Sequence, residues 1–509
     1  MLLTDVMKEN MERFGEYPFL HYGEKTYTNF ETAIHAKQIA SALKNLGIQK
    51  GDRVLVCMPN CPEVIFSYQG ILHAEAVVIP VMFLLHAQEI AFILENSRAN
   101  AIITSAMLVP KLQEAVRSVA TNPMILAVDA PSAENVQNLY DLMNQADASL
   151  ISDRLNLDEN DLAVILYTSG TTGKPKGVML THKNLYSNAA SSASLNTDGR
   201  STTLGVLPLA HVYGFTVTNV CFLLGNSVVI FSKFDPDAIF KAIETYKVKG
   251  FSAVPAMIHA MVTSPHADRY DLSSLEWVGS GSAPLPVALL EAFRQKFNAE
   301  VYEGYGLSEA APTVTAHRKK GIVKPGSVGI PIPGVEIQIV DPHGRELPTG
   351  EVGELIVRGP NVTTGYFQNP DATESAIQNG WLHTGDMAKV DEDGYLYIVD
   401  RKKDLIIRGG FNIYPRDLEE LLVSHEAVSE AAVIGVASER LGEEVIAYVV
   451  KQAGKEVTEQ ELIQFCQDRL AKYKTPRRIL FIDQLPRNGV GKILKQRLRD
   501  MSSEVELIL

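Results

Sequence analysis

The sequence predicts an α/β fold with a large amino-terminal part and a small carboxy-terminal α+β domain. Within the first 160 residues, apolar strand-like runs at 54–58 and 76–81 alternate with helical patterns such as 30–46, which is typical of stacked sheets covered by helices. From about Gly326, short alternating runs separated by Gly, Pro and Asp predict a β-rich part. After the charged segment 400–404, the last hundred residues predict a compact α+β domain.

The individual elements follow from local patterns along the chain. Residues 161–167 are a continuous apolar run, which predicts a buried strand, and Thr181 is placed to cap a helix that begins near His182. Thr458 and Glu461 form a capping box before a helix. The other expected strands are 227–231, 299–302, 335–340, 354–358, 395–399, 428–436 and 445–450, and the other expected helices are 286–297 and 417–423. We expect an amino-terminal domain over residues 1–400, with its β-rich part at about 326–400, and a carboxy-terminal domain over 401–509.

The composition excludes several classes of protein. The 509 residues carry 47 Lys and Arg against 60 Asp and Glu, a formal net charge of -13. Duplex nucleic acids are bound through basic surfaces, so a chain this acidic is a poor general nucleic-acid binder. A small anionic ligand needs only a few well-placed cations and stays compatible with this charge.

The cysteines and the apolar runs predict a cytoplasmic, soluble enzyme. The four cysteines, with only Cys57 and Cys61 close together, complete no zinc pattern and are typical of thiols in a reducing compartment. No apolar signal core stands at the amino terminus. The longest apolar stretch, 71–85, contains His73, Glu75 and Pro80 and is too short to span a bilayer. Peripheral contact with a membrane stays open.

The strongest local signal is the segment 167–177, which reads YTSGTTGKPKG. Its three glycines let the backbone approach an anion, its hydroxyls add donors, and Lys174 and Lys176 add mobile charge. A buried strand leads into it, at the sheet edge where α/β folds bind ligands. The glycine spacing is not that of a Walker loop, and Pro175 interrupts the position where a helix would start. The segment therefore predicts a phosphate site of another kind, the alternative being an ordinary exposed turn.

This segment resembles the phosphate loop of the adenylate-forming superfamily, which includes acyl-CoA synthetases, aryl-CoA ligases, peptide-synthetase adenylation domains and firefly luciferase. The resemblance continues to the end of the chain as motifs in the family's order, and it is strongest to bacterial medium- or long-chain fatty-acid CoA ligases. It implies that the carboxy-terminal domain is mobile and turns about a hinge near Lys403, for which a solvated linker lysine is the alternative. The cofactors and co-substrates it implies are ATP, Mg²⁺ and coenzyme A.

The same resemblance assigns the nucleotide site. Glu309, in the segment YGLSE, would bind Mg²⁺ together with Thr168, while Tyr305 would stack on adenine. Asp386, with Arg401 as its partner, would hold the ribose, a task suited to a carboxylate that accepts two hydrogen bonds. Lys492 matches the catalytic lysine, so the catalytic set is Lys492, Glu309 and Thr168. The implied ATP and AMP contacts are Thr168, Ser169, Gly170, Thr171, Thr172, Gly173, Lys174, Lys176, Gly281, Ser282, Ala283, Glu303, Gly304, Tyr305, Gly306, Leu307, Ser308, Asp386, Arg401 and Lys492.

The acceptor and acyl sites are also assigned by resemblance. The pair Gly409-Gly410, with Phe411, would pass the pantetheine of CoA, and a simple hairpin turn is the alternative. The acyl pocket would be lined by His211, Tyr213, Gly214, Phe215, Val254 and Gly279, together with Phe251 and Val278. This set offers no acidic anchor for an amino acid, and the glycines at 205, 214 and 279 are expected to leave room for a chain. Lys492 lies in a segment that also resembles the acetylation site of some relatives.

The sequence thus predicts an ATP-dependent acid–thiol ligase that activates a carboxylic acid, preferably a fatty acid, as acyl-AMP and then forms acyl-CoA. An aryl-CoA ligase and a free-standing enzyme that loads a carrier protein stay open within the same family. A catalytically silent nucleotide-binding regulator is the alternative from another class, and retention of Lys492, Glu309 and Asp386 argues against it. The expected partners are the acid, ATP and CoA, and a homodimer stays open.

Overall fold

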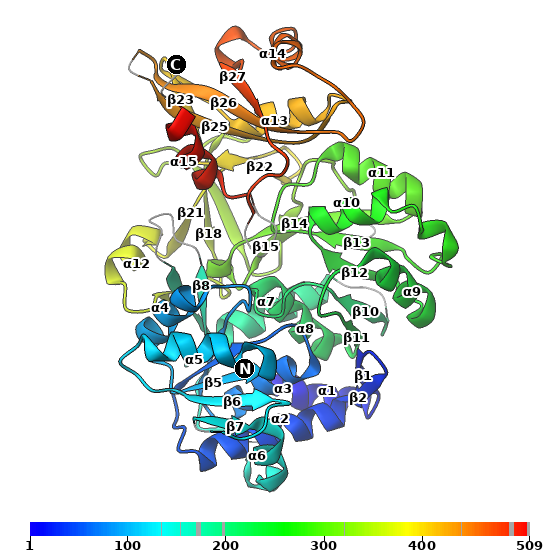
Figure 1. Ribbon diagram of the computed structural model, residues 1–509, viewed down its shortest axis with the longest axis vertical. Helices are drawn as coiled ribbons and strands as arrows, with labels where there is room; N and C mark the ends of the chain where they lie inside the picture. Colours follow the sequence, from blue (N-terminus) through cyan, green and yellow to red (C-terminus); the bar gives the residue numbers. More distant parts are fainter. Residues whose placement is uncertain are drawn as a thin grey trace.

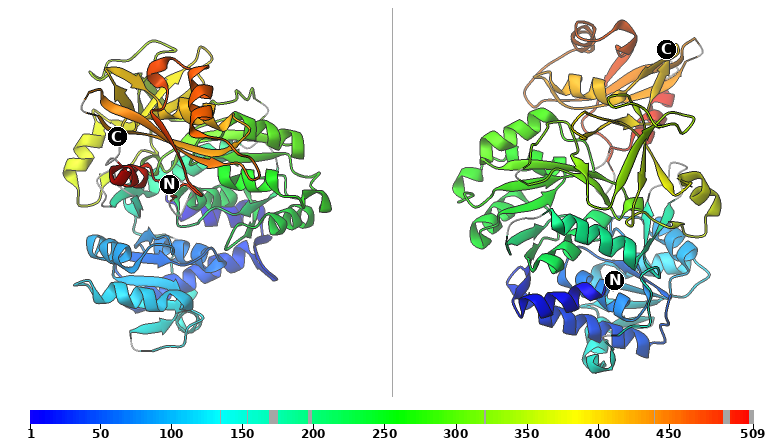
Figure 2. Two further views of the ribbon diagram at one scale, coloured as in Figure 1. Left: turned by 45° about the horizontal axis from the view of Figure 1, so that its top comes forward. Right: turned by 180° about the vertical axis from the view of Figure 1, so that it is seen from behind.

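The computed structural model describes residues 1–133, 135–152, 154–168, 175–195, 199–319, 321–438, 440–487 and 493–505. The chain forms three tiers (Figure 1). The amino-terminal α/β sheet lies at one end, a second α/β layer and the β-rich part lie in the middle, and the carboxy-terminal domain lies at the other end, as the two further views also show (Figure 2).

The first sheet has eight strands in the order β19-β9-β8-β4-β3-β5-β6-β7, and every neighbouring pair from β8 to β7 is parallel. Parallel strands are buried on both faces, which explains the unbroken apolar runs in the sequence. The strands are β3 (Arg53–Cys57), β4 (Val77–Pro80), β5 (Ala101–Ser105), β6 (Met124–Val128), β7 (Val136–Asn138), β8 (Leu162–Thr168), β9 (Lys176–Thr181) and β19 (Gly365–Tyr366). The accompanying helices are α2 (Asn29–Asn45), α3 (Pro62–His73), α4 (Ala87–Ser97), α5 (Val109–Arg117) and α6 (Leu139–Gln145).

Two further sheets complete the α/β region. The order β10-β11-β1-β2 joins β10 (Thr202–Gly205), β11 (Ser227–Ile230), β1 (Pro18–Tyr22) and β2 (Lys25–Thr28). The order β12-β13-β14-β15-β16 joins β12 (Gly250–Ala253), β13 (Trp277–Ser280), β14 (Glu300–Gly306), β15 (Thr313–Ala316) and β16 (Ile330–Pro331). The helices of this region are α1 (Asp5–Phe14), α7 (His182–Ser194), α8 (Val212–Leu224), α9 (Pro236–Tyr246), α10 (Pro255–Thr263) and α11 (Val287–Phe297).

The last two sheets are largely antiparallel. The β-rich sheet runs β17-β18-β21-β20, with β22 paired to β21; its elements are β17 (Glu336–Val340), β18 (Gly353–Arg358), α12 (Pro370–Ala376), β20 (Ile377–Gln378), β21 (Trp381–Val390) and β22 (Leu396–Arg401). The carboxy-terminal sheet runs β24-β23-β26-β25, with β27 paired to β26. Its elements are β23 (Ile406–Arg408), β24 (Phe411–Ile413), α13 (Pro415–Val423), β25 (Val428–Ser438), β26 (Gly442–Lys451), α14 (Glu459–Gln467), β27 (Arg478–Phe481) and α15 (Lys495–Val505).

The predicted fold class is confirmed, and so are the local signals behind it. Both capping predictions hold: the Thr181 side chain accepts the amide of Asn184, and the Thr458 side chain accepts that of Glu461. The strand expected at 299–302 is longer, because β14 continues to Gly306 by pairing with β15. The pairing of β14 with β15 cannot be predicted from the pattern of apolar and polar residues within β14 itself. None of the helices in the described ranges combines the length and apolar character needed to cross a bilayer.

Candidate active site

The two strands that flank the predicted phosphate loop form an antiparallel hairpin. Thr168 ends β8 directly opposite Lys176, which begins β9. The predicted loop residues Ser169, Gly170, Thr171, Thr172, Gly173 and Lys174 lie outside the described residues. The hairpin therefore brings the Thr168 hydroxyl and the Lys176 ammonium to the same end of the sheet, where the loop connects them.

Glu309 lies next to this hairpin. It sits in a single 3₁₀ turn, Ser308–Ala310, that packs against β9. Its carbonyl accepts the amide of Thr363 at 2.7 Å, and its Oε1 accepts the hydroxyl of Tyr366 at 2.9 Å. Tyr366 is paired with Val178 of β9, and its ring centroid lies 5.1 Å from the Lys176 ammonium. The structure thus brings Glu309 and the strands of the phosphate loop together, as the motifs predicted.

Asp386 is the centre of a buried polar group. The residue is 3% exposed. Its Oδ2 accepts the Tyr305 hydroxyl at 2.5 Å, and its Oδ1 lies 3.1 Å from Arg401 Nε. Asp386 and Arg401 face each other across β21 and β22. Burial, followed by the nearby Asp386 charge, holds the pKa of Tyr305 well above its ordinary value, so the phenol stays protonated and keeps donating. The arrangement joins three motifs that lie far apart in the sequence.

Glu303 lies two residues before Tyr305 and is 4% exposed. It pairs with Ser280 across β13 and β14, beside the segment of Gly281, Ser282 and Ala283. Burial raises the pKa of Glu303 to about 7, and the positive charge of Arg416 opposes that rise. Ser282 has a φ of 71°, a conformation that a non-glycine residue rarely adopts, so this part of the segment has a constrained backbone.

The predicted acyl lining divides between two faces of α8. His211 is the cap of this helix, and its Nδ1 accepts the amide of Tyr213. Tyr213 packs toward the β12–β14 layer, where a Cβ on Gly279 would lie 3.6 Å from its hydroxyl. Val254, 9% exposed, borders the same layer. Phe215 instead packs against Tyr68 of α3, with ring centroids 5.1 Å apart.

Several residues of the predicted acyl set lie in tightly packed surroundings, and the acyl lining itself stays a prediction. A Cβ on Gly214 would lie 2.3 Å from the Pro208 carbonyl oxygen, and one on Gly205 would lie 3.0 Å from Val228. Gly205 and Gly214 therefore permit close packing of the backbone, which by itself accounts for a glycine at each position. Phe251 and Val278 are wholly buried in the core of the second layer. Burial this complete reflects tertiary packing, which the sequence does not specify residue by residue.

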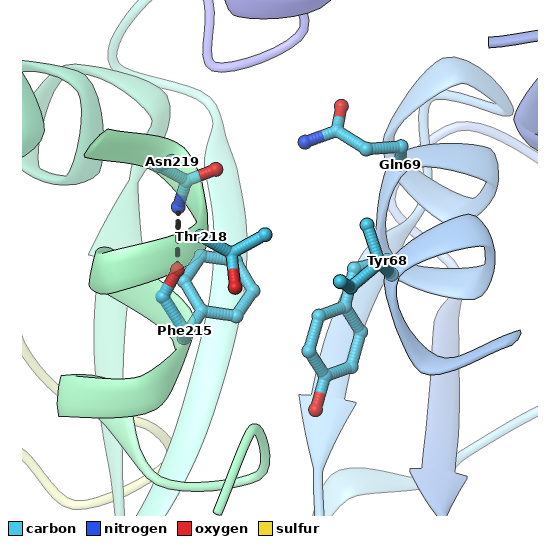
Figure 3. Close-up of a pocket in the computed structure, with 6 residues that line it drawn as sticks. Tyr68, Gln69, Phe215, Thr218 and Asn219 are labelled. Atoms are coloured by element: carbon cyan, nitrogen blue, oxygen red, sulfur yellow. Dashed lines mark hydrogen bonds between the residues drawn. The ribbon is translucent and has the colours of Figure 1, made fainter. Parts of the chain in front are cut away.

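Phe215 lines a small cavity between α3 and α8 (Figure 3). Tyr68 and Gln69 face it from α3, while Phe215, Thr218 and Asn219 face it from α8. The buried Oε1 of Gln69 has no hydrogen-bond partner. The cavity is thus lined partly by polar groups and lies on the side of α8 away from Tyr213.

The two glycines of the predicted CoA passage form the turn of a hairpin. Gly409 and Gly410 join β23 to β24 with φ values of 59° and 84°, both in the left-handed region that favours glycine. Phe411 is 57% exposed and stacks on Tyr473, with ring centroids 4.8 Å apart. The hairpin turn accounts for the glycines by itself, and an exposed aromatic pair stands beside it.

The predicted hinge lies where the β-rich sheet ends. Lys403 is exposed in the turn after β22. The adjoining Asp404 carboxylate accepts Arg499 of α15 at 2.7 Å, and Lys495 of the same helix pairs with Glu419 at 2.8 Å. The predicted catalytic residue Lys492 lies outside the described residues, just before α15. One ion pair therefore ties the helix that follows Lys492 to the hinge turn, and a second ties it to α13.

Sequence reasoning left out three residues of this region. Tyr366 is absent from the predicted site residues, although it contacts both Glu309 and Lys176. Tyr473 and Arg499 carried no signal at all, because their partners lie tens of residues away in the chain. The one sequence signal for Tyr366 is its place after Gly365, within the part of the chain that resembles the family.

The donor set fits Mg²⁺ bound mainly by nucleotide. In the described part of the chain, no group of three or more His, Cys, Asp and Glu side chains is arranged to hold a metal. Glu309 and Thr168 supply a carboxylate and a hydroxyl, which are hard oxygen ligands. Mg²⁺ is commonly held by one or two carboxylates plus substrate phosphates, so these two residues would be enough as the protein's share.

Comparison with known proteins agrees with this geometry. The family model described as AMP-binding enzyme matches residues 7–367, and that of the AMP-binding enzyme C-terminal domain matches residues 417–492. The long-chain-fatty-acid–CoA ligase of Bacillus subtilis (strain 168) is 37% identical across 99% of this chain and 95% of its own, and 4-coumarate:CoA ligase 1 of Petunia hybrida is 36% identical across 96% and 92%. The crystal structure of ATP-bound MatB from Rhodopseudomonas palustris superimposes with a TM-score of 0.91 at 30% identity, across 99% of this chain and 100% of that one. The resemblance read from the motifs is confirmed, and the chain belongs to the AMP-binding enzyme family of adenylate-forming ligases.

Proposed function

We propose that this protein is an ATP-dependent acid–CoA ligase that activates a medium- or long-chain fatty acid. The observation that carries the proposal is the buried Asp386 carboxylate, which accepts the Tyr305 hydroxyl and pairs with the partly exposed Arg401. Tyr305 lies four residues before Glu309 in the chain. A simple phosphate site would not need a buried carboxylate placed for vicinal hydroxyls. The Asp386 carboxylate together with the Glu309 turn suits a nucleotide, because one can bind the ribose and the other the metal-bound phosphates.

The roles of the residues follow from their chemistry. Asp386 is proposed to accept the ribose hydroxyls, with Arg401 keeping its carboxylate charged and oriented. Tyr305 supplies a flat ring for adenine. Glu309 and Thr168 would hold Mg²⁺, which when bound neutralises phosphate charge. Lys176 would add a mobile positive charge beside the phosphates.

The first half-reaction is an in-line displacement. The substrate carboxylate oxygen attacks the α-phosphorus, the bond to the bridging oxygen breaks, and pyrophosphate leaves with that electron pair. Positioning and neutralisation of charge do most of the work in such transfers. Lys492 is proposed to place its ammonium against the developing charge between the carboxylate and the α-phosphate.

The second half-reaction needs a different arrangement of the same chain. The CoA thiol, as thiolate, attacks the acyl carbon of the adenylate, and AMP leaves. We place the domain boundary at residue 400/401 and the hinge at Lys403, so that turning the carboxy-terminal domain withdraws Lys492. Gly409, Gly410 and Phe411 would then border the path of the pantetheine.

The preference for a fatty acid rests on the lining beside Tyr213. The neighbouring Val254 and Gly279 present no charged side chain that would anchor an amino acid. The 37% identical relative from B. subtilis is a long-chain-fatty-acid–CoA ligase, which supports the same choice. The second candidate is an aryl acid, favoured by the petunia 4-coumarate:CoA ligase at 36% identity.

Acid-dependent exchange of pyrophosphate into ATP and thioester formation test this proposal. Both are measured with saturated acids of graded length, benzoate, cinnamate and 4-coumarate. We expect the highest kcat/KM with chains of medium or long length. A preference for the aryl acids would show that the substrate is an aryl acid rather than a fatty acid. If no acid supported pyrophosphate exchange, the ligase proposal would be wrong.

The acceptor and the setting need their own measurements. Comparison of CoA with a holo carrier protein as acceptor decides between a CoA ligase and a carrier-loading enzyme, and we expect CoA to be used. We propose a cytoplasmic site of action, supported by four cysteines that are all unpaired thiols. Light scattering of the purified protein tests the homodimer, and vesicle sedimentation tests contact with a membrane surface.

A further inference from the structure

We propose that Tyr366 is a positioning residue that fixes Glu309 relative to Lys176 in the nucleotide site. The inference rests on the proposed function and deepens it. The Tyr366 hydroxyl donates to Glu309 Oε1 at 2.9 Å, and its ring lies under the Lys176 ammonium, 5.1 Å from the centroid. One side chain therefore contacts both the proposed metal ligand and a cation of the phosphate loop.

The backbone fixes the place of this ring. β19 pairs with β9 so that Tyr366 faces Val178, and the amide of Phe367 donates to the Gly177 carbonyl at 2.7 Å. The amide of Tyr366 itself donates to the Thr373 hydroxyl of α12 at 2.9 Å. The ring thus has no freedom to shift along the strand without breaking several hydrogen bonds.

Gly365 allows the close approach that places Tyr366. Its φ is 137°, and a Cβ there would lie 2.4 Å from the side chain of Thr373. A residue with a side chain would push α12 away from β19 and displace the neighbouring tyrosine. The two neighbouring residues therefore act together: Gly365 lets β19 pack closely against α12, and Tyr366 contacts Glu309 and Lys176.

Glu309 is held from the same short segment. The Thr363 amide donates to the Glu309 carbonyl at 2.7 Å, and the Thr363 hydroxyl donates to the Met179 carbonyl of β9. Asn361 donates to the carbonyl of Ala310 at 2.7 Å. Residues 361–366 therefore tie the backbone of the Glu309 turn to the phosphate-loop strand, and Tyr366 adds the tie at the side chains.

The Tyr366 contacts restrict the positions of the Glu309 carboxylate and the Lys176 ammonium without adding a charge of their own. A tyrosine hydroxyl is protonated at neutral pH, so Tyr366 can donate its hydrogen bond to Glu309 Oε1. The hydrogen bond on Oε1 restricts the rotation of the Glu309 carboxylate. The ring face attracts the Lys176 ammonium and limits the range of its flexible stem. We expect both effects to lower the cost of assembling the site around Mg²⁺ and ATP.

Two variants separate the hydroxyl from the ring. Tyr366→Phe removes the hydrogen bond and keeps the cation–ring contact, whereas Tyr366→Leu removes both. The matched control is Tyr397→Phe, because the Tyr397 hydroxyl also donates to a carboxylate, that of Asp391 at 3.2 Å, and Lys389 lies 5.9 Å from its ring centroid. This control lies in the β-rich sheet and is expected to behave like the parent chain.

The variants are compared by calorimetric binding of ATP across a Mg²⁺ titration and by the KM and kcat of pyrophosphate exchange. We expect Tyr366→Phe to raise both the Mg²⁺ requirement and the KM for MgATP about tenfold, the usual scale of a hydrogen bond to a charged group. Tyr366→Leu is expected to raise both about threefold more. Thermal midpoints are recorded for all three variants, and Tyr366→Phe is expected to stay close to the parent.

Unchanged Mg²⁺ dependence in Tyr366→Phe would overturn the proposal, since a merely structural tyrosine would move the thermal midpoint alone. Tighter Mg²⁺ binding would also overturn it, because the hydrogen bond would then compete with the metal. The calorimetric arm is independent of turnover. If no acid supports exchange while Mg²⁺-dependent ATP binding still weakens in Tyr366→Phe, the ligase proposal fails and the role of Tyr366 stands.

Discussion

Arg401 Nε lies 3.1 Å from Asp386 Oδ1, directly across from it on the adjacent strand, while the other carboxylate oxygen accepts the Tyr305 hydroxyl. The carboxylate is nearly wholly buried and is held from two sides before any ligand is bound. A charge fixed in this way can meet hydroxyl groups without paying to be oriented first. Arg401 also ends β22, the last strand before the proposed hinge, so the proposed ribose contact and the proposed domain movement lie close together.

Replacing this carboxylate tests its role. Asp386→Asn is expected to lower kcat/KM for ATP in pyrophosphate exchange about 10- to 100-fold, because hydrogen bonds that involve a charged group are lost. The matched control is Asp391→Asn, whose carboxylate likewise contacts a tyrosine, Tyr397, and a cation, Lys324, at 2.6 Å. Equal losses in both variants, with equal falls in thermal midpoint, would show that Asp386 acts only on stability.

Lys492 is expected to serve only one half-reaction. Lys492→Ala should slow adenylation by about 100- to 1000-fold, the scale for removing one stabilising donor, and should leave thioester formation from a supplied acyl-adenylate nearly unchanged. The two steps are measured separately, with exposed Lys455→Ala as the control. Equal survival of both half-reactions would contradict the role given to Lys492.

A substitution at the proposed hinge residue, Lys403, is expected to impair thioester formation rather than adenylation. Lys403→Pro fixes the backbone φ of that residue, so we expect it to slow thioester formation by at least about tenfold while adenylation persists. Lys403→Ala, which keeps the torsional freedom, is the control and should retain both steps. Single-turnover measurements of each half-reaction distinguish the two variants. A loss confined to adenylation would place the hinge elsewhere.

The raised pKa of Glu303 predicts that the free energy of unfolding depends on pH. Its folded pKa, about 7, lies above its ordinary value, so the folded state holds a proton that the unfolded state has lost between about pH 4.5 and 7. Stability from this group is therefore complete below pH 4.5 and falls as pH rises through 7, by about 3 kcal/mol in total. Glu303→Gln carries no such proton and should lose less stability between pH 5 and pH 8 than the parent.

Thermal midpoints of both chains at pH 5, 6, 7 and 8 provide the measurement. The midpoint difference between variant and parent should grow in favour of Glu303→Gln as pH rises. Parallel midpoint curves for the two chains would mean that the Glu303 carboxyl is solvated or already ionised. ATP binding at each pH, measured alongside, separates a change in stability from a change in the site.

Local chemistry explains which features the sequence could predict. The cap at Thr181 and the apolar run of β8 depend on neighbours within a few residues, so they were readable from the chain alone. The motifs around Glu309 and Asp386 were recognisable as strings, although nothing in the strings placed them together. The acyl set was only partly predictable, because which face of α8 a side chain takes depends on what packs against it.

The amino-acid sequence alone was enough to predict the fold class, the family and the residue types that a nucleotide site requires. Those properties lie in periodicity, capping and ordered motifs, which are local along the chain. The contacts of Tyr366 with Glu309 and Lys176, the packing of Phe215 away from Tyr213, and the ion pair of Arg499 with Asp404 became visible only in the folded chain. Those contacts arise from strand pairing and core packing between segments far apart in sequence, and no local pattern encodes such distances.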